Sequence, residues 1–221
     1  MKEGYLHSYF LRNNDRLIHK WSHYFDIYER HFNRFIDKEI LLFEIGVFKG
    51  GSAQMWKSYF GDKIKIVGID IDPNCKKYED ENFSVEIGNQ SDINFLKEIV
   101  EKYGKPNVVI DDGSHIMSDV IKTFDYLYYN TDKNGVYLIE DTHTSYWEEY
   151  GGGVKRKDSV MEFVKDKLDE INAYHTRGKI HKSDFTKQTD SITIYDSIVV
   201  FERKPQSMRV DMKTGFFDST F

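Results

Sequence analysis

Cysteine and proline are scarce in this sequence, and their scarcity limits what it can form. The 221 residues include a single cysteine, Cys75, and three prolines. One cysteine excludes an internal disulfide and a cysteine-rich zinc site. With so few prolines, and with no repeat or low-complexity tract, no linker between domains is indicated. The length is sufficient for one well-packed domain and too short for two large ones.

Basic charge and long apolar runs are also lacking. Acidic residues outnumber lysine and arginine, and the formal net charge is −6, whereas a general nucleic-acid binder needs a basic surplus to neutralise phosphates. No apolar run approaches the roughly 20 residues of a membrane-spanning helix. Segment 1–16 is polar and lacks the apolar centre of a secretory signal. We therefore expect a soluble, cytoplasmic protein that binds neither nucleic acid nor a membrane.

From about residue 38 the chain alternates between short apolar runs and segments of helical spacing. This alternation is typical of parallel β-α-β units, which form a sheet covered on both faces. Segment 191–203 contains two β-rich halves separated by Asp196 and Ser197, which predicts a closing antiparallel hairpin. The predicted fold class is α/β: a doubly wound, mostly parallel, Rossmann-like sheet with this hairpin at its C-terminal end.

Three parts of the chain follow from this pattern. Residues 1–37 carry aromatic side chains at roughly helical spacing and predict a helical N-terminal extension, which serves as a cap over the site or as an oligomer contact. Residues 38–204 form the sheet domain, and residues 205–221 form a tail without clear periodicity. The aromatic helix makes a homo-oligomer a reasonable expectation.

Acidic residues follow the fourth and fifth apolar runs. Ligands of open parallel sheets bind beyond the carboxyl ends of the strands. Asp112 ends the fourth run, and Glu140 and Asp141 end the fifth, with only one helix between the two runs. Three converging carboxylates raise one another's pKa values unless a cation neutralises them, and oxygen ligands select a hard ion such as Mg²⁺. Asp111 is an alternative to Asp112, as a ligand, a cofactor contact or a residue that orients the loop.

The loop after the first apolar run is rich in glycine. Gly46, Gly50 and Gly51 permit a tight turn and bring backbone N–H groups close to a ligand. Phe48 replaces the middle glycine of a dinucleotide fingerprint, so the loop suits NAD and a dehydrogenase poorly. Asp70 ends the second run, where an acid can hold two ribose hydroxyls. A ribose-bearing ligand without a pyrophosphate, such as S-adenosylmethionine, therefore fits better.

Several motifs resemble those of a known enzyme family. In order along the chain, they are FEIGVFKGGS, VGIDIDP, IGNQSD and IDDGSH, which resemble class I S-adenosylmethionine-dependent methyltransferases. Together with LIEDTHTSYW and YDSIVVFE they resemble the metal-dependent sugar O-methyltransferases of the mycinamicin and macrolide deoxysugar type, over roughly residues 20–203. The resemblance implies that residues 38–204 are an S-adenosylmethionine-binding methyltransferase domain. It also implies Mg²⁺, or another divalent cation, as a second cofactor.

The resemblance assigns roles to most of the candidate residues, and the residues themselves suggest roles for Asp111, His143, Tyr146 and Trp147. His115 is the general base, and Asp112, Glu140 and Asp141 are the metal ligands. The expected cofactor contacts are Glu44, Gly46, Gly50 and Ser52 for the methionine part, Asp70 for the ribose, Gln90 and Ser91 near the adenine, and Asp111. A helix N-cap is the alternative role of Ser52. His143, Tyr146 and Trp147 are candidate substrate contacts, with a surface position for the histidine and core packing for the other two rings as alternatives.

The expected reaction is methylation of a sugar hydroxyl. The acceptor is a nucleotide-activated sugar, a surface glycan in polysaccharide biosynthesis, or a glycosylated natural product. The loop of residues 150–159 combines three glycines with a basic cluster, which suggests a lid and a phosphate-bearing acceptor. Two other functions stay open. One is a non-haem iron oxygenase that uses His115, His143 and a carboxylate, and the other is a non-catalytic methyltransferase-like binding module.

Overall fold

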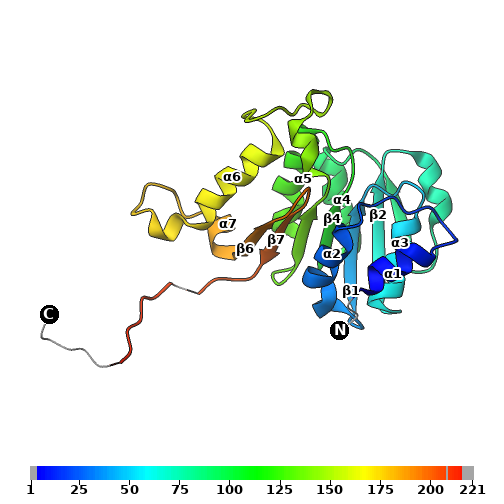
Figure 1. The fold of residues 1–221 in the computed structure, drawn as a ribbon, viewed down its shortest axis with the longest axis horizontal. Coiled ribbons are helices and arrows are strands. Elements are labelled where there is room, and N and C mark those ends of the chain that lie inside the picture. The colour runs from blue at the N-terminus through cyan, green and yellow to red at the C-terminus, as the bar shows by residue number, and fades with distance from the viewer. Residues whose placement is uncertain (1–3, 208, 216–221) are drawn as a thin grey trace, which may run out of the picture.

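The computed structural model describes residues 4–207 and 209–215, and its centre is one seven-stranded sheet (Figure 1). The strands are β1 (Ile40–Ile45), β2 (Ile64–Asp70), β3 (Phe83–Ile87), β4 (Val108–Asp111), β5 (Val136–Ile139), β6 (Thr189–Ile194) and β7 (Val199–Arg203). Their order in the sheet is β3-β2-β1-β4-β5-β7-β6. Strands β1 to β5 are parallel, whereas β7 is antiparallel to both β5 and β6. The predicted fold class, including the antiparallel hairpin, is confirmed.

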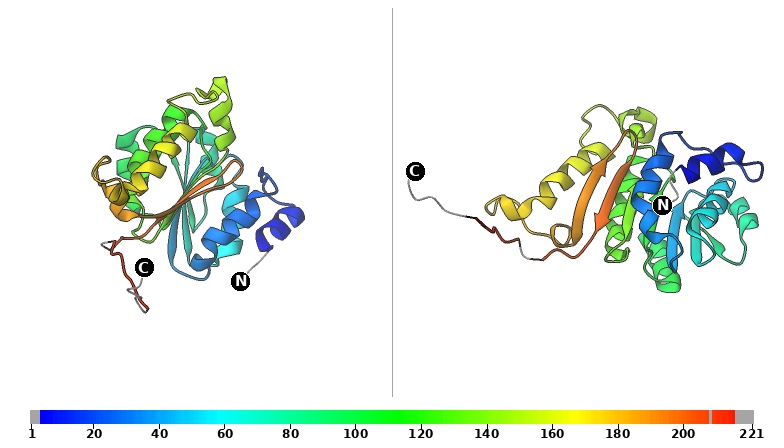
Figure 2. Two further views of the ribbon diagram at one scale, coloured as in Figure 1. Left: turned by 60° about the vertical axis from the view of Figure 1, so that its left-hand side comes forward. Right: turned by 60° about the horizontal axis from the view of Figure 1, so that its bottom comes forward.

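Helices cover both faces of the sheet (Figure 2). They are α1 (Tyr5–Arg12), α2 (Tyr24–Phe32), α3 (Gly51–Phe60), α4 (Ile93–Tyr103), α5 (Met117–Asn130), α6 (Val160–Ile171) and α7 (Asp184–Gln188). Short 3-10 helices are η1 (Asn33–Phe35), η2 (Pro73–Tyr78), η3 (Thr142–Tyr146), η4 (Glu148–Tyr150) and η5 (Ala173–His175). Helices α1 to α3 contribute to the apolar core on one face, and α4 to α7 contribute to the core on the other. Among the described residues, no helix is long and apolar enough to cross a bilayer.

The N-terminal helices are part of the packed structure. Phe25, Tyr28 and Phe32 of α2 are fully buried, and the rings of Tyr28 and Phe32 both contact Trp56 of α3. The aromatic spacing therefore supplies a helix-packing face, as its period of about four residues requires. The division of the chain at residues 37 and 204, and the homo-oligomer, stay predictions. The described residues after 204 contain no helix or strand and run away from the sheet (Figure 1).

Strand register brings the predicted site residues together. Asp111 pairs with Ile45 of β1 on one side and with Ile139 of β5 on the other. The ladder continues past the strand ends, because Asp112 N–H donates to the Ile45 carbonyl and Glu140 N–H donates to the Asp111 carbonyl, both at 2.9 Å. The residues that follow β1, β4 and β5 therefore lie together at the carboxyl ends of these parallel strands.

Gly46 allows two of these loops to approach closely. Its φ is +90°, and a Cβ atom there would lie 2.1 Å from the Asp112 carbonyl oxygen. Gly178 has a similar φ of +84° but open space around it. We expect Gly178→Ala to lower the free energy of unfolding by about 1–2 kcal/mol through backbone strain, and Gly46→Ala to lower it by about 1–3 kcal/mol more through the clash. Urea denaturation measures both, and equal losses would contradict the close approach.

Candidate functional site

Charged side chains from distant parts of the chain meet beyond β4 and β5. Lys20 Nζ donates to Asp112 Oδ2 at 2.5 Å and to Glu140 Oε2 at 2.7 Å. The Tyr24 hydroxyl donates to Asp141 Oδ1 at 2.5 Å. Burial disfavours the charged ammonium, but Asp112 and Glu140 outweigh it and raise the pKa of Lys20. The carboxylates thus converge, as predicted, and meet a lysine from the segment before α2.

His115 lies beside the same carboxylates. Its Nε2 is 3.7 Å from Asp112 Oδ1 and 3.8 Å from Asp141 Oδ2. His115 and Asp141 have φ values of +57° and +52°, a left-handed conformation that is uncommon outside glycine and frequent at functional sites. Ligand atoms of Asp112, His115 and Asp141 all lie within 4.8 Å of one another. These three residues are therefore close enough to hold one metal ion.

Glu140 was predicted to be a metal ligand, and it lies next to this group. Its side chain is 1% exposed, and its Oε1 accepts no hydrogen bond from the described residues. Burial, followed by repulsion from Asp112, raises the pKa of Glu140, while Lys20 acts in the opposite direction. A buried carboxylate oxygen without a partner is costly unless a cation or a donor reaches it. The oxygen is therefore a suitable ligand atom.

Asp111 points away from the carboxylate cluster. Its Oδ1 accepts a hydrogen bond from Gln90 Nε2 at 3.1 Å, and its Oδ2 accepts one from the Tyr137 hydroxyl at 3.2 Å. Burial raises the pKa of Asp111 to about 7, although both hydrogen bonds favour the charged form. Adjacent residues at a strand end face opposite sides of the sheet. Of the two aspartates, Asp112 is thus the one that faces the other carboxylates, and Asp111 supports Gln90.

Two adjoining cavities lie over the ends of β1, β2 and β4. One, of about 320 Å³, is lined by Gly46, Asp70 and Gln90 among others. The second, of about 430 Å³, shares Gly46 and Asp70 and extends to Asp112, His115 and Asp141. A ligand bound along both cavities would therefore contact the glycine loop at one point and the carboxylate group at another.

Asp70 fastens the glycine loop. Its Oδ2 accepts hydrogen bonds from the backbone N–H groups of Val47 at 2.8 Å and Phe48 at 3.1 Å. Its Oδ1 accepts one from the N–H of Asp72 at 2.9 Å. Phe48 has a φ of +52°, so this carboxylate holds the loop in a strained turn. The predicted ribose contact is therefore also a structural anchor of the loop.

Asp111 and four other predicted cofactor residues line neither cavity. Glu44 is buried, its Oε1 accepts a hydrogen bond from the Trp56 indole at 2.8 Å, and burial raises its pKa. Gly50 is the N-cap of α3, so Ser52 lies inside the helix and the N-cap alternative for it is wrong. The Ser91 hydroxyl donates to a neighbouring side chain in its own loop. Their roles around the cofactor stay predictions.

The candidate substrate residues form an aromatic group beside the carboxylates. The His143 ring lies edge-on to Trp21 at 6.0 Å and to Trp147 at 4.8 Å between ring centroids. Tyr146 and Trp147 are 51% and 45% exposed, so neither is packed in the core. His143 Nδ1 is 2.6 Å from Ser197 Oγ, which fixes the ring. These rings are placed to meet a ligand at the surface, and a role in substrate binding stays a prediction.

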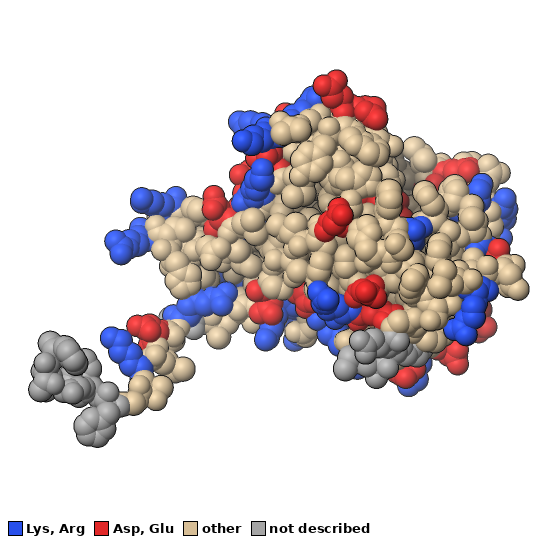
Figure 3. Space-filling model, in the orientation of Figure 1, with Lys and Arg blue, Asp and Glu red and all other residues tan. Residues whose placement is uncertain are grey.

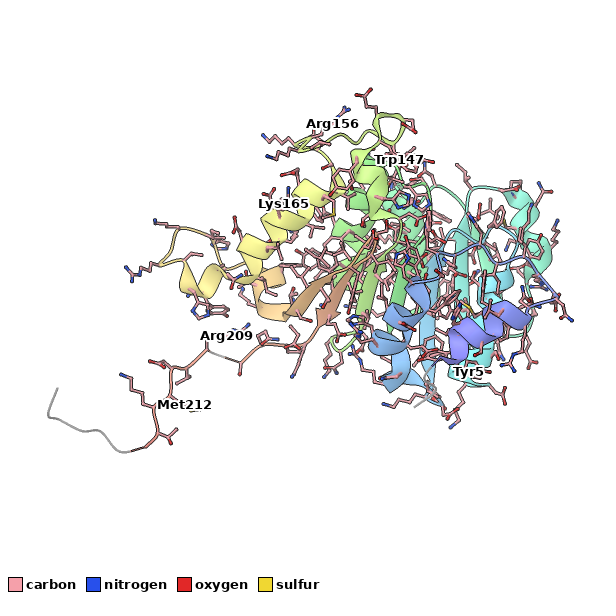
Figure 4. All side chains as sticks on the ribbon, in the orientation of Figure 1. Tyr5, Trp147, Arg156, Lys165, Arg209 and Met212 are labelled. Atoms are coloured by element: carbon pink, nitrogen blue, oxygen red, sulfur yellow. The ribbon has the colours of Figure 1, made fainter. Side chains whose placement is uncertain are left out.

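The basic loop of residues 150–159 lies at the same end of the sheet, where Figure 4 labels Trp147 and Arg156. It borders a cavity of about 570 Å³ whose lining contains Arg156 and Lys157 but also Asp158. On the described part of the face in Figure 3, basic and acidic side chains are interspersed around this loop. The lining is therefore mixed in charge, and a phosphate-bearing acceptor is less strongly indicated than the sequence suggested.

Sequence reasoning missed Lys20 and Tyr24. Both come from the segment that was interpreted as an N-terminal extension, more than 80 residues before the carboxylates that they contact. A single lysine in a charged, aromatic segment has no periodicity or motif that identifies it. Only the packing of α2 on the sheet reveals its partners.

Comparisons with known proteins identify methyltransferases. No family model matches the sequence. Mycinamicin VI 2''-O-methyltransferase of Micromonospora griseorubida is 39% identical over 155 residues, which are 65% of this chain and 38% of that protein. The 8-demethyl-8-alpha-L-rhamnosyl tetracenomycin-C 2'-O-methyltransferase of Streptomyces olivaceus is 36% identical over 200 residues, which are 85% of this chain and 52% of that protein. The chain thus spans about half, or less, of the length of these relatives.

A solved methyltransferase structure has a fold similar to that of this chain. It is a methyltransferase of the mycinamycin biosynthetic pathway in complex with Mg, SAH and mycinamycin VI. It superimposes with a TM-score of 0.78 and 27% sequence identity, over 91% of this chain and 53% of that one.

Proposed function

This chain is related to the S-adenosylmethionine-dependent O-methyltransferases of macrolide and other deoxysugars, and we propose that it transfers a methyl group from S-adenosylmethionine to a sugar hydroxyl. The observation that carries the proposal is the convergence of His115 with Asp112 and Asp141 next to a cavity that reaches the glycine loop. A base, a cation site and a cofactor cavity at one edge are what this reaction requires.

The residues present fit a divalent cation. Asp112, His115 and Asp141 offer ligand atoms within 4.8 Å of one another, and Glu140 Oε1 is buried and free of hydrogen bonds from the described residues. Carboxylate oxygens are the ligands that Mg²⁺ prefers. We assign Asp112, Glu140 and Asp141 as ligands, with Tyr24 orienting Asp141 through its hydroxyl. A bound divalent cation would lower the pKa of the acceptor hydroxyl.

The chain's own residues supply the rest of the reaction. His115 would accept the proton of the sugar hydroxyl through Nε2, the atom that faces Asp112 and Asp141. Asp70 and the glycine loop would bind and orient the cofactor, so that the sulfonium methyl faces the acceptor oxygen. Such a transfer needs no covalent enzyme intermediate, and alignment of the two reactants is the main contribution of the protein.

The acceptor that we favour is a sugar on a glycosylated small molecule, because the relatives' names describe such substrates. The exposed rings of Tyr146 and Trp147 suit a sugar face or an apolar aglycone. A nucleotide-activated sugar or a surface glycan would need cationic contacts, and the loop at residues 150–159 offers a mixed lining. The iron-oxygenase alternative has less support, because His143 lies outside the group formed by Asp112, His115 and Asp141.

Transfer of a tritium-labelled methyl group from S-adenosylmethionine tests the proposal. The acceptors are a panel of rhamnosides, glycosylated macrolides and nucleotide sugars, each assayed with Mg²⁺ and with EDTA. We expect labelled product with at least one glycosylated small molecule, lost in EDTA and restored by Mg²⁺. Transfer that is unaffected by EDTA would contradict the role of the cation. Absence of labelled product with every acceptor, together with oxidation of an acceptor that requires Fe²⁺ and O₂, would favour the iron alternative.

Replacement of Asp70 tests the cofactor assignment. Asp70→Asn removes the negative charge of a carboxylate that would bind the ribose. The same carboxylate accepts hydrogen bonds from three backbone N–H groups. A hydrogen bond to a charged group contributes about 1.5–3 kcal/mol, so we expect S-adenosylhomocysteine to bind roughly 10- to 100-fold more weakly. Calorimetry measures the affinity. Asp62→Asn, at an exposed aspartate that lines neither cavity, is the control and should change the affinity by less than about threefold; a similar loss in both variants would contradict a specific role for Asp70.

A further inference from the structure

The segment of residues 13–23 connects α1 with α2 and passes over the carboxyl ends of the parallel strands. It carries Lys20 to the carboxylates there. Its carbonyl oxygens at Arg16 and Leu17 lie so close to Gly51 that a Cβ on the glycine would be 2.6 and 2.3 Å away. Arg16 Nη1 also donates to the Tyr78 carbonyl at 3.0 Å. The segment therefore packs on the start of α3, at the glycine loop, before it reaches the carboxylates.

Lys20 is the buried cation that this segment brings to the carboxylates. Its side chain is 4% exposed, and its ammonium contacts one oxygen each of Asp112 and Glu140. When all three are ionised, the carboxylates of Asp112, Glu140 and Asp141 carry more negative charge than one ammonium compensates. The proposed function assigns these same carboxylates to a divalent cation, but it gives Lys20 no role.

The ammonium and a divalent cation would share two carboxylates. Nζ lies 2.5 Å from Asp112 Oδ2 and 2.7 Å from Glu140 Oε2, which leaves Asp112 Oδ1 and Glu140 Oε1 as the oxygens that a cation could take. A cation on those oxygens would lie within a few ångströms of Nζ, because each pair of oxygens belongs to one carboxylate. Two positive charges that close in a water-poor site repel each other strongly. Each therefore weakens the binding of the other to Asp112 and Glu140.

We propose that Lys20 is an internal competitor of the divalent cation. In the metal-free protein its ammonium holds Asp112 and Glu140 together, and it withdraws from them when the cation binds. The inference rests on the proposed metal-dependent function. It adds that cation affinity is set by the segment of residues 13–23, which also packs on the glycine loop at Gly51. Cation binding and the position of that segment are then coupled.

Calorimetric titration with Mg²⁺, in the presence of saturating S-adenosylhomocysteine, tests the competition. Lys20→Met removes the ammonium and is expected to tighten Mg²⁺ binding by about tenfold or more, since tenfold corresponds to 1.4 kcal/mol. Lys20→Arg keeps the charge and should bind Mg²⁺ no more tightly than the wild type. Lys65→Met is the control, because Lys65 is an exposed lysine of β2 that lines neither cavity, and it should change the affinity by less than about twofold.

Equal or weaker Mg²⁺ binding by Lys20→Met would overturn the inference and make Lys20 a support of the ligands. Such a result leaves the proposed function intact, because Mg²⁺ still binds. Absence of a Mg²⁺ heat from all four proteins would contradict the metal-dependent function and the inference together. Binding of S-adenosylhomocysteine by each variant reports separately that the fold and the cofactor site are present.

Hydrogen exchange of the wild-type protein is a second test, and it needs no folded variant. If Lys20 withdraws on cation binding, the backbone amides of residues 13–23 exchange faster with Mg²⁺ than with EDTA. Amides of β6, the outermost strand of the sheet and two strands beyond β5, serve as the internal reference. Their exchange rates should not change. Unchanged or slower exchange of residues 13–23 at a Mg²⁺ concentration that saturates the calorimetric signal would overturn the withdrawal.

Discussion

Replacement of His115 by asparagine is expected to lower the rate of methyl transfer by about 10²–10⁴-fold, the usual contribution of a general base. Nε2 of His115 is the basic atom that faces Asp112 and Asp141, at 3.7 and 3.8 Å. Asparagine is chosen because residue 115 has a φ of +57°, which asparagine adopts more readily than alanine does. The rate is measured with labelled S-adenosylmethionine, and calorimetry should show S-adenosylhomocysteine binding within about threefold of the wild type.

His143→Asn is the matched control for His115. His143 Nδ1 is 3.9 Å from Asp141 Oδ1, but it is also 2.6 Å from Ser197 Oγ and is packed against Trp147. We expect this variant to raise KM for the acceptor and to reduce kcat by less than about tenfold, as for a substrate contact. Full methyl transfer by His115→Asn would remove His115 as the base. A larger kcat loss in His143→Asn than in His115→Asn would exchange their roles.

The adjacent acids Asp111 and Asp112 are expected to respond differently to the same substitution. Asp112→Asn should abolish the Mg²⁺ heat and lower methyl transfer on the order of 10²-fold or more, because charge stabilisation by a bound cation contributes several kcal/mol. Asp111→Asn should retain the Mg²⁺ heat, because the Asp111 carboxylate faces Gln90 and Tyr137 in the core. The two titrations are compared at one cofactor concentration.

This pair also resolves an alternative that the sequence left open. If Asp111→Asn abolished the Mg²⁺ heat and Asp112→Asn retained it, the ligand assignment would be reversed. Unfolding by urea accompanies both titrations, because the side chain of Asp111 is buried and its replacement affects stability as well. A loss of Mg²⁺ binding that occurs only in a destabilised Asp111→Asn protein would reflect the fold.

The fold class and the location of the site could be predicted from the sequence, because both depend on local patterns. Apolar runs such as segment 108–111 can be buried only in a covered parallel sheet, and β4 is buried throughout. Carboxylates that follow neighbouring parallel strands must meet at one edge, so the convergence of Asp112, Glu140 and Asp141 required no knowledge of side-chain positions. The hairpin followed from its turn residues in the same way.

Other features depend on contacts between distant segments, and the sequence did not reveal them. Lys20 reaches Asp112 only because α2 packs on α3, where Tyr28 contacts Trp56. The different directions of Asp111 and Asp112 became visible only when the hydrogen bonds of Asp111 were known. Ser52 has the chemistry of an N-cap, but the left-handed backbone at Gly50 starts the helix two residues earlier, and a glycine takes this conformation without strain.

Calorimetric titration with S-adenosylhomocysteine, first in EDTA and then with excess Mg²⁺, tests the central claim most directly. The cavities over β1, β2 and β4 predict micromolar binding in both buffers, together with a separate Mg²⁺ heat that disappears in Asp112→Asn. Absence of S-adenosylhomocysteine binding in both buffers, by a protein that unfolds cooperatively in urea, would contradict the assignment of the site to methyl transfer.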